Sequence, residues 1–420
     1  MSSPPTNNSK QTRKSPVRHP IRAVRELAYV EVASTELTRD INRDLILEYV
    51  RSSQPVSRVD LARLSGLQPS TVSSIVEQLK EERWIKEGGA VTTARGRRPT
   101  MLALNDDLLI LVADVRPTQA VLAVVDLNGR FLSRLVVPLA TKVQRSIGAI
   151  ADGMNVLRGQ FPQKSFEGIG LSVQGRVEPQ SNRLTLAPNL NWKNYDICGE
   201  LSRRVGGLRV ELENDANSCL LSELWFGHLD GLRNVVLIAI SEGVGAAVLA
   251  EGRLISGRGG LAGEFGHICV DASGPLCGCG KHGCWEMFAS SRAALRYYAE
   301  LTGSTDKLTM SDLATLAVSK NPAALRALER QSEAIGRGLR MINAALSPEV
   351  ILFAGDITTV WELSHSIIER ECRAGLLTGS APKLMSIGDG ELALLRGAAA
   401  VVLQRHSGYY RSAHGKQQRD

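Results

Sequence analysis

The segment from Glu264 to Glu286, EFGHICVDASGPLCGCGKHGCWE, restricts the possible folds of this chain more than any other part of it. Its cysteines Cys277, Cys279 and Cys284 can supply thiolates, and His267 can supply an imidazole nitrogen. Three sulfurs and one nitrogen make a closed tetrahedral ligand set for zinc. We therefore expect a loop that a structural zinc ion holds in place.

Each end of this segment carries a carboxylate. A zinc ion in the loop would fix Glu264 relative to Glu286, and both side chains would offer hydrogen-bond acceptors to a hydroxyl-rich ligand. The glycines among the cysteines leave the backbone free to wrap around an ion. Two alternatives stay open: the loop could fold without metal, or Cys269, two residues after His267, could compete as a ligand.

The other cysteines point to a reduced environment. The chain holds seven cysteines, an odd number, and its start carries no apolar secretory segment. We therefore expect no disulfide framework and a cytoplasmic location. Cys198, Cys219 and Cys372 each lie among apolar neighbours, which predicts small buried hydrophobic residues. No apolar run approaches the roughly 20 residues of a membrane span, so no membrane partner is expected.

Positive charge is concentrated at the beginning of the chain. The formal net charge is +7, and residues 1–104 hold 17 lysines and arginines against 11 aspartates and glutamates. This part of the chain therefore prefers an anionic partner. Residues 1–36 are predicted to be a disordered basic arm, which either contacts phosphates or only aids solubility.

Residues 37–104 read as three helices and a hairpin. Ile41 to Val50 carry one apolar stripe, and Val59, Leu61 and Leu64 mark a second, short helix that Gly66 ends. A third helix is expected to begin at Pro69, with one apolar face. Its opposite face carries short hydrogen-bonding side chains with almost no charge: Ser70, Thr71, Ser73, Ser74 and Gln78.

The hairpin that follows carries a cluster of arginines at its tip: Arg95, Arg97 and Arg98. Three helices and a basic hairpin are the order of a winged helix-turn-helix domain, whose third helix reads bases in the major groove. We therefore predict that these arginines and the polar face of the third helix contact operator DNA. A three-helix domain that docks on a protein is the alternative.

From residue 107 the pattern of apolar and polar residues is typical of an α/β domain. Short apolar runs such as LLILVADV, AVLAVVDL, GIGLSV, NVVLIAI and EVILFAG alternate with helical stretches, which predicts buried strands. Only residues 105–107 connect the two parts, so the orientation of one should be transmitted to the other. This domain is expected to span residues 107–405, and residues 406–420 form a polar tail.

From about Asn42 to about Arg405, the chain resembles the ROK family of bacterial sugar kinases and sugar-responsive repressors. The resemblance rests on five motifs, of which the last two together are highly specific: GIGLSVQGRVE at 168–178, APNLNW at 187–192, ENDAN at 213–217, GLAGEFGH at 260–267 and CGCGKHGCWE at 277–286. The N-terminal domain places the chain in the repressor branch. The resemblance implies a two-lobed, actin-like ATPase (ribonuclease H-like) fold with ligand in the cleft between the lobes.

The resemblance also implies particular roles. In the family, the positions that contact sugar hydroxyls correspond to Asn189, Asn214, Asp215, Glu264, His267 and Glu286. His267 would bind zinc through one ring nitrogen and offer the other to a hydroxyl. In the kinases of the family, the position of Asp215 is the general base that accepts the proton of the attacking hydroxyl. By itself, the Asn214-Asp215 pair would more commonly cap a helix.

Three nucleotide loops depart from the pattern of the family's kinases. The expected DxGGT stands here as Asp114 to Thr118, where a proline removes a backbone donor. The expected GTGIG begins with Ser241 and Glu242, and a carboxylate there would repel phosphate. A third glycine-rich turn reads Ala354-Gly355-Asp356. These departures predict a protein that binds no ATP and is not an enzyme.

We therefore expect a zinc-containing, sugar-responsive repressor of genes for carbohydrate uptake or catabolism. Its effector would be a sugar or sugar phosphate. A homodimer or homotetramer is expected, because paired recognition helices read half-sites about 34 Å apart. Two alternatives stay open: an ATP-dependent hexose or amino-sugar kinase with an attached DNA-binding domain, and a constitutive DNA-binding protein that keeps the sugar fold as a scaffold.

Overall fold

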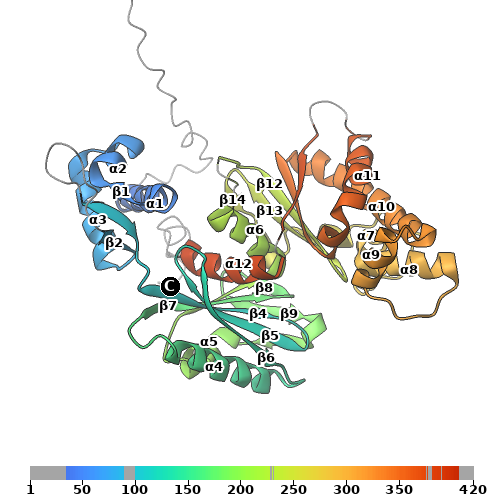
Figure 1. Cartoon of the computed structure of the whole chain (residues 1–420), viewed down its shortest axis with the longest axis horizontal. Coiled ribbons are helices and arrows are strands. Elements are labelled where there is room, and N and C mark those ends of the chain that lie inside the picture. The colour runs from blue at the N-terminus through green and yellow to red at the C-terminus, as the bar shows by residue number, and fades with distance from the viewer. Residues whose placement is uncertain are drawn as a thin grey trace, which may run out of the picture.

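The computed structural model describes residues 35–88, 100–227, 229, 231–374, 376, 381–388 and 390–405 (Figure 1). Most of the predicted basic arm, the hairpin tip with Arg95, Arg97 and Arg98, and the tail from residue 406 lie outside these ranges. The first described helix begins at Thr35, within the stretch predicted as arm. In the described part of the chain, no helix is both long and apolar enough to cross a membrane.

The N-terminal unit contains three helices and three short strands. In chain order these are α1 (Thr35–Ser53), β1 (Val56–Ser57), α2 (Arg58–Ser65), α3 (Pro69–Glu81), β2 (Ile85–Gly88) and β3 (Met101–Leu104). The strands form an antiparallel sheet in the order β1-β3-β2. The three helices and the β2-β3 pair follow the order that the sequence predicts for residues 37–104, whereas β1 was not predicted.

Local signals explain the ends of these helices. Ser57 caps α2 by accepting a hydrogen bond from the backbone of Asp60, and Gly66 ends the helix in the left-handed conformation at φ 70°. Pro69 occupies the first turn of α3, as predicted. One expectation differs: of the apolar residues assigned to the second helix, only Leu61 is buried, whereas Val59 is 76% exposed.

The first lobe is built on a five-stranded sheet in the order β11-β7-β4-β5-β6. Its strands are β4 (Leu108–Val115), β5 (Gln119–Asp126), β6 (Phe131–Pro138), β7 (Ser165–Val173) and β11 (Val210–Asn214). Helices α4 (Val143–Gly159) and α5 (Ile197–Arg204) pack on one face. A small antiparallel sheet is formed by β8 (Arg176–Glu178), β9 (Arg183–Ala187) and β10 (Trp192–Tyr195).

The second lobe is built on a five-stranded sheet in the order β14-β13-β12-β15-β16. Its strands are β12 (Val235–Ile240), β13 (Val244–Ala250), β14 (Arg253–Leu254), β15 (Val350–Gly355) and β16 (Lys383–Ser386). Five helices pack against this sheet or against one another: α7 (Glu286–Ala289), α8 (Ser291–Thr302), α9 (Met310–Val318), α10 (Pro322–Leu346) and α11 (Trp361–Arg373). The apolar runs that predict buried strands all fall in β4, β5, β7, β12 and β15.

Two helices lie between the lobes (Figure 1). They are α6 (Asp215–Phe226), which packs on the second sheet, and α12 (Gly390–Arg405), which packs on the first. They also pack against each other. A change in the angle between the two sheets would therefore alter the packing of these two helices.

The N-terminal unit shares a hydrophobic core with the first lobe. One continuous cluster of buried side chains joins α1 and α3 to β4, β5 and α12. The connection at residues 105–107 is also held in place: Asn105 donates to the backbone of Arg83, and Asp107 pairs with Lys164. The N-terminal unit and the first lobe are therefore joined by packing as well as by a short linker.

Candidate metal centre and ligand site

The predicted metal ligands come together. The ligand atoms of His267, Cys277, Cys279 and Cys284 all lie within 4.8 Å of one another. Cys279 Sγ lies 3.5 Å from Cys284 Sγ, and Cys277 Sγ lies 3.5 Å from His267 Nδ1. A tetrahedral zinc ion with bonds of about 2.3 Å to sulfur and about 2.0 Å to nitrogen requires roughly 3.8 Å and 3.5 Å for these separations. The donor set therefore fits a tetrahedral metal ion.

The backbone around this centre is tightly folded. His267 ends the 3-10 turn η3 (Glu264–His267), and a bridge between Cys269 and Cys284 brings the two halves of the segment together. Gly283 has φ 67°, and a Cβ there would lie 1.5 Å from the backbone oxygen of Asp271. Cys269 is exposed and lies outside the donor set, so the alternative in which it competes as a ligand is wrong.

The three thiols of the donor set differ in acidity. Burial raises the pKa of Cys277 and of Cys284 above the ordinary value of a thiol. The backbone N–H of Lys281 lowers the pKa of the more exposed Cys279. A divalent cation among these sulfurs would stabilise all three as thiolates.

Two carboxylates and an arginine lie next to the donor set. Glu286, at the start of α7, places Oε1 3.6 Å from His267 Nδ1 and 2.8 Å from Cys277 Sγ. The other ring nitrogen, His267 Nε2, lies 3.8 Å from Glu264 Oε2. Arg176 of the first lobe pairs with Glu264 at 3.4 Å. The metal centre is therefore connected through Glu264 to the opposite lobe.

The start of α6 forms the other wall of the site. Asn214 accepts hydrogen bonds from the backbone of Ala216 and Asn217, and its Nδ2 donates to Gly175 O at 2.9 Å. The capping role that the residue pair alone would suggest is thus present. Burial raises the pKa of Asp215 from 3.8 to about 6, and the negative charge of Asp114 contributes to this shift.

A continuous series of contacts links five of the six predicted sugar ligands. It runs from Asp215 and Asn214 through Gly175 and Arg176 to Glu264, His267 and Glu286. Asn189 lies in the separate 3-10 turn η1 (Pro188–Leu190), with its side chain exposed. Sequence reasoning missed Arg176, although it lies within the GIGLSVQGRVE motif.

The three nucleotide loops also reach this junction. Arg116 donates from Nε to the buried Asp114 at 2.6 Å, so the guanidinium lies on a carboxylate of the first loop. In the second loop, a Cβ at Gly243 would lie 3.0 Å from Glu286 Oε2. Gly355 of the third loop pairs with Ile240 at the end of β12. The carboxyl ends of strands from both sheets thus converge here.

The polar face of α3 is partly used within the N-terminal unit. Ser70, Ser73 and Ser74 are exposed, and Thr71 is half-buried. Gln78 accepts a hydrogen bond from Arg39 at 3.1 Å and donates to Glu82 at 2.8 Å. Ser73 Oγ donates to Pro69 O of its own helix. Gln78 is therefore engaged with α1 as well as being a candidate base contact.

Known proteins resemble this chain over most of its length. A family model described as the ROK family matches residues 112–405. The xylose repressor of Bacillus subtilis is 28% identical over 386 residues, which cover 89% of this chain and 98% of that protein. The alignment with the repressor therefore includes the N-terminal unit.

Solved structures of ROK family proteins are also similar to this chain. A ROK family transcriptional regulator, described as a homologue of the E. coli MLC protein, matches with a TM-score of 0.78 and 25% identity, over 90% of this chain and 99% of that one. A ROK family glucokinase from Streptomyces griseus, in complex with glucose and AMPPNP, matches with a TM-score of 0.62 and 29% identity. The match covers 70% of this chain and 99% of the glucokinase chain. The predicted two-lobed fold is confirmed.

Proposed function

The chain belongs to the ROK family over residues 112–405, and from this premise we propose that it is a sugar-responsive transcriptional repressor. Residues 37–104 would bind operator DNA as a winged helix-turn-helix, and the junction between the two lobes would bind a sugar or sugar phosphate. The target genes would serve carbohydrate uptake or catabolism.

One observation carries the sugar-binding proposal. Amide and carboxylate groups from both lobes meet in one connected set, from Asn214 and Asp215 through Arg176 to Glu264, His267 and Glu286. A sugar presents alternating donors and acceptors, and groups of this kind can satisfy both. Because the set draws on both lobes, a bound sugar would bridge them and change the angle between them. Asn189 would join the ligand contacts in that closed arrangement.

The metal is proposed to be structural zinc. His267, Cys277, Cys279 and Cys284 would supply all four ligands of a tetrahedral zinc ion, which would leave no position for a catalytic water. When bound, the ion would hold the thiols as thiolates and fix the ring of His267. Nε2 of that ring would then face Glu264 and the ligand.

We infer that the chain does not phosphorylate its sugar. A phosphate loop needs backbone donors and space for negative charge. Here Pro117 lacks the donor, the Arg116 side chain lies on Asp114, and Glu242 brings a carboxylate to the second loop. Arg292 donates to the backbone oxygen of Glu242 and holds that loop in place.

The DNA-binding proposal rests on chemistry and on resemblance. The exposed serines of α3 offer hydrogen bonds without repelling phosphate, and the basic hairpin follows in the sequence. The B. subtilis relative, which aligns through this unit, is named as a repressor. A homodimer or homotetramer would present two such units to neighbouring half-sites.

The decisive experiment is a thermal-shift screen of hexoses, pentoses, amino sugars and their phosphates, followed by anisotropy titration of operator DNA with any hit. We expect one class of sugar to raise the melting temperature and to change operator affinity. ATP-dependent phosphorylation of the same sugar, abolished by Asp215→Asn, would establish the kinase alternative instead. If no sugar affects stability or DNA binding, the chain is a constitutive DNA-binding protein.

A further inference from the structure

Helix α6 extends from the proposed sugar site to the N-terminal unit. Its first residue is Asp215, and Asn214 caps its N-terminus, so both ligand candidates sit at one end. Its last residue is Phe226, so the helix has 12 residues. At about 1.5 Å per residue the helix is roughly 18 Å long. A displacement imposed at the sugar end would therefore move its far end as well.

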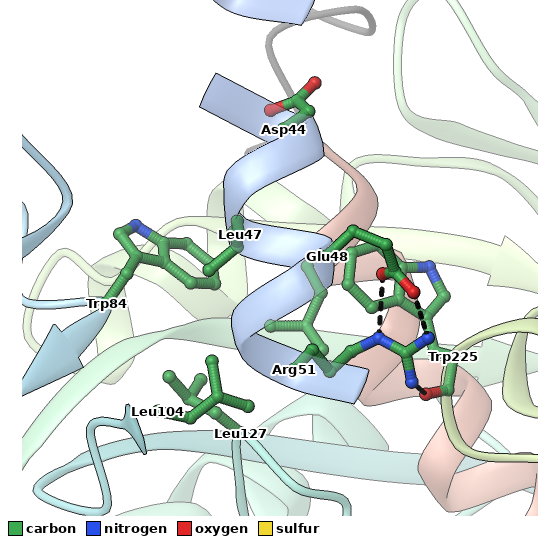
Figure 2. A pocket seen from close by; sticks show the side chains of 9 residues that line it. Asp44, Leu47, Glu48, Arg51, Trp84, Leu104, Leu127 and Trp225 are labelled. Atoms are coloured by element: carbon green, nitrogen blue, oxygen red, sulfur yellow. Dashed lines mark hydrogen bonds and ion pairs between the residues drawn. The ribbon is translucent and has the colours of Figure 1, made fainter. Parts of the chain in front are cut away.

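That far end receives a side chain from α1. Arg51 Nη1 donates to the backbone oxygen of Trp225 at 2.5 Å. The last four carbonyl groups of a helix lack partners within the helix, and the negative end of the helix dipole attracts a cation. Arg51 therefore caps α6 from a different domain. Glu48 orients the guanidinium through two further contacts, at 2.8 and 2.5 Å (Figure 2).

The space beside this contact is incompletely filled. A pocket opens between α1 and the first lobe, with walls from Leu47, Trp84, Leu104, Leu127 and Leu403 (Figure 2). Asp44, Glu48 and Arg51 also line this pocket, so the unfilled space lies directly beside the ion pair of Arg51. The pocket leaves room for α1 to shift when the end of α6 moves.

A shift of α1 would carry the proposed recognition helix with it. The guanidinium of Arg43, which is 1% exposed, donates from Nε to Glu82 Oε2 at 3.0 Å, at the end of α3. Arg39 donates to Gln78 of α3 at 3.1 Å. Helices α1 and α3 also belong to one hydrophobic core. They are thus connected by both polar and apolar contacts.

We propose that the contact between Arg51 and the Trp225 carbonyl couples the sugar site to the DNA-binding unit. This inference rests on the proposed function. Sugar bound by Asn214 and Asp215 moves α6, the movement changes the cap that Arg51 provides, and α1 carries α3 to a new angle. Arg51 is a positioning residue: it touches neither sugar nor DNA bases in this scheme.

The test is the ratio of operator dissociation constants with and without a sugar that the thermal-shift screen identifies. Coupling between sites commonly gives a ratio of about 5 to 150. In Arg51→Ala we expect this ratio to fall to within about twofold of one, while sugar affinity in the absence of DNA stays within about twofold of the original. By reciprocity, the effect of DNA on sugar affinity should vanish as well.

Two further variants sharpen the result. Arg63→Ala removes a charge from an exposed side chain of the same unit, so it controls for a general loss of attraction to DNA, and its ratio should be unchanged. Glu48→Gln keeps Arg51 but weakens its orientation, so an intermediate ratio is expected even if Arg51→Ala folds poorly.

The outcomes separate the inference from the function on which it rests. If Arg51→Ala and Glu48→Gln both keep the full ratio, the coupling runs elsewhere and this proposal is wrong. If the unaltered protein shows no sugar response at all, the proposed function itself is wrong and the coupling is wrong with it.

Discussion

Asn214 serves the fold and the proposed ligand site at once. Its Oδ1 caps α6, and its Nδ2 binds the backbone of Gly175, beside Arg176. The cap holds the side chain in one orientation, which is what a binding residue requires. A helix cap and a ligand contact are therefore compatible uses of the same amide.

The surroundings of Asp215 disfavour the ionised form of its side chain. Burial is the main cause of the rise of its pKa from 3.8 to about 6, and Asp114 adds a like charge nearby. Below about pH 4 the folded and unfolded chains both carry the proton, so burial costs little. As pH rises to about 6, the unfolded chain releases the proton first and the folded state loses stability relative to it.

Asp215→Asn should remove this loss. We expect the free energy of unfolding of the variant, relative to that of the unaltered protein, to increase by on the order of 2 kcal/mol between about pH 4 and pH 7. Above that range this difference should be constant. Urea unfolding at several pH values measures the difference. Asp152→Asn, on the exposed face of α4, controls for the removal of one carboxylate from the chain. A difference that does not vary with pH would contradict the raised pKa of Asp215.

At the scale of elements, the segment from Glu264 to Glu286 joins the candidate metal centre to the proposed ligand site. The turn η3 carries Glu264 and His267, and α7 begins with Glu286. Trp285 anchors α7 to α10 by donating to Ala334 O at 2.8 Å. The carboxylates at both ends of the segment are thus positioned by the metal centre and by the second lobe together.

Cys279→Ala should release the metal, because three ligands remain where a structural site needs four. We expect a loss of about one equivalent of zinc and a fall of more than about 5 °C in melting temperature. Elemental analysis and calorimetry measure both quantities. Cys269→Ala is a matched control, because this exposed cysteine lies in the same segment but outside the donor set. Equal metal content in the two variants would overturn the proposed ligand set.

The parts of the site that sequence could predict are those with local spacing or a family motif. The candidate metal ligands all lie within residues 267–284, so their spacing can be recognised in one short segment of the sequence. Arg176 lies within a family motif, but its partner Glu264 is 88 positions away, so the fold alone defines this pair. Arg116 lies two residues from its partner Asp114, and sequence reasoning missed this local pair. The contact between Arg51 and the Trp225 carbonyl joins residues 174 positions apart and uses a backbone acceptor. Every residue has a backbone carbonyl, so the sequence does not indicate which one accepts from Arg51. The fold is needed to identify this contact.

At the scale of the whole molecule, the domain boundary drawn from the sequence does not separate two cores. The pattern of apolar residues changes near residue 107. Nevertheless, the buried side chains of α1 and α3 form one core with those of β4, β5 and α12. Helix α12 comes from the end of the described chain and packs against the first lobe and α6. The N-terminal unit and the first lobe should therefore open together, while the second lobe has its own core.

Leu395→Ala tests this division. Leu395 lies on α12, is 0% exposed and belongs to the core shared with the N-terminal unit, so its truncation should cost about 2 to 5 kcal/mol. Hydrogen exchange should then rise in α3 as much as in β4, although Leu395 is remote from both in sequence, and α10 should change little. Ile342→Ala, an equally buried change in the core of the second lobe, should raise exchange in α10 and spare α3. Unchanged exchange in α3 on truncation of Leu395 would mean that the N-terminal unit opens independently of the first lobe, in spite of the shared core.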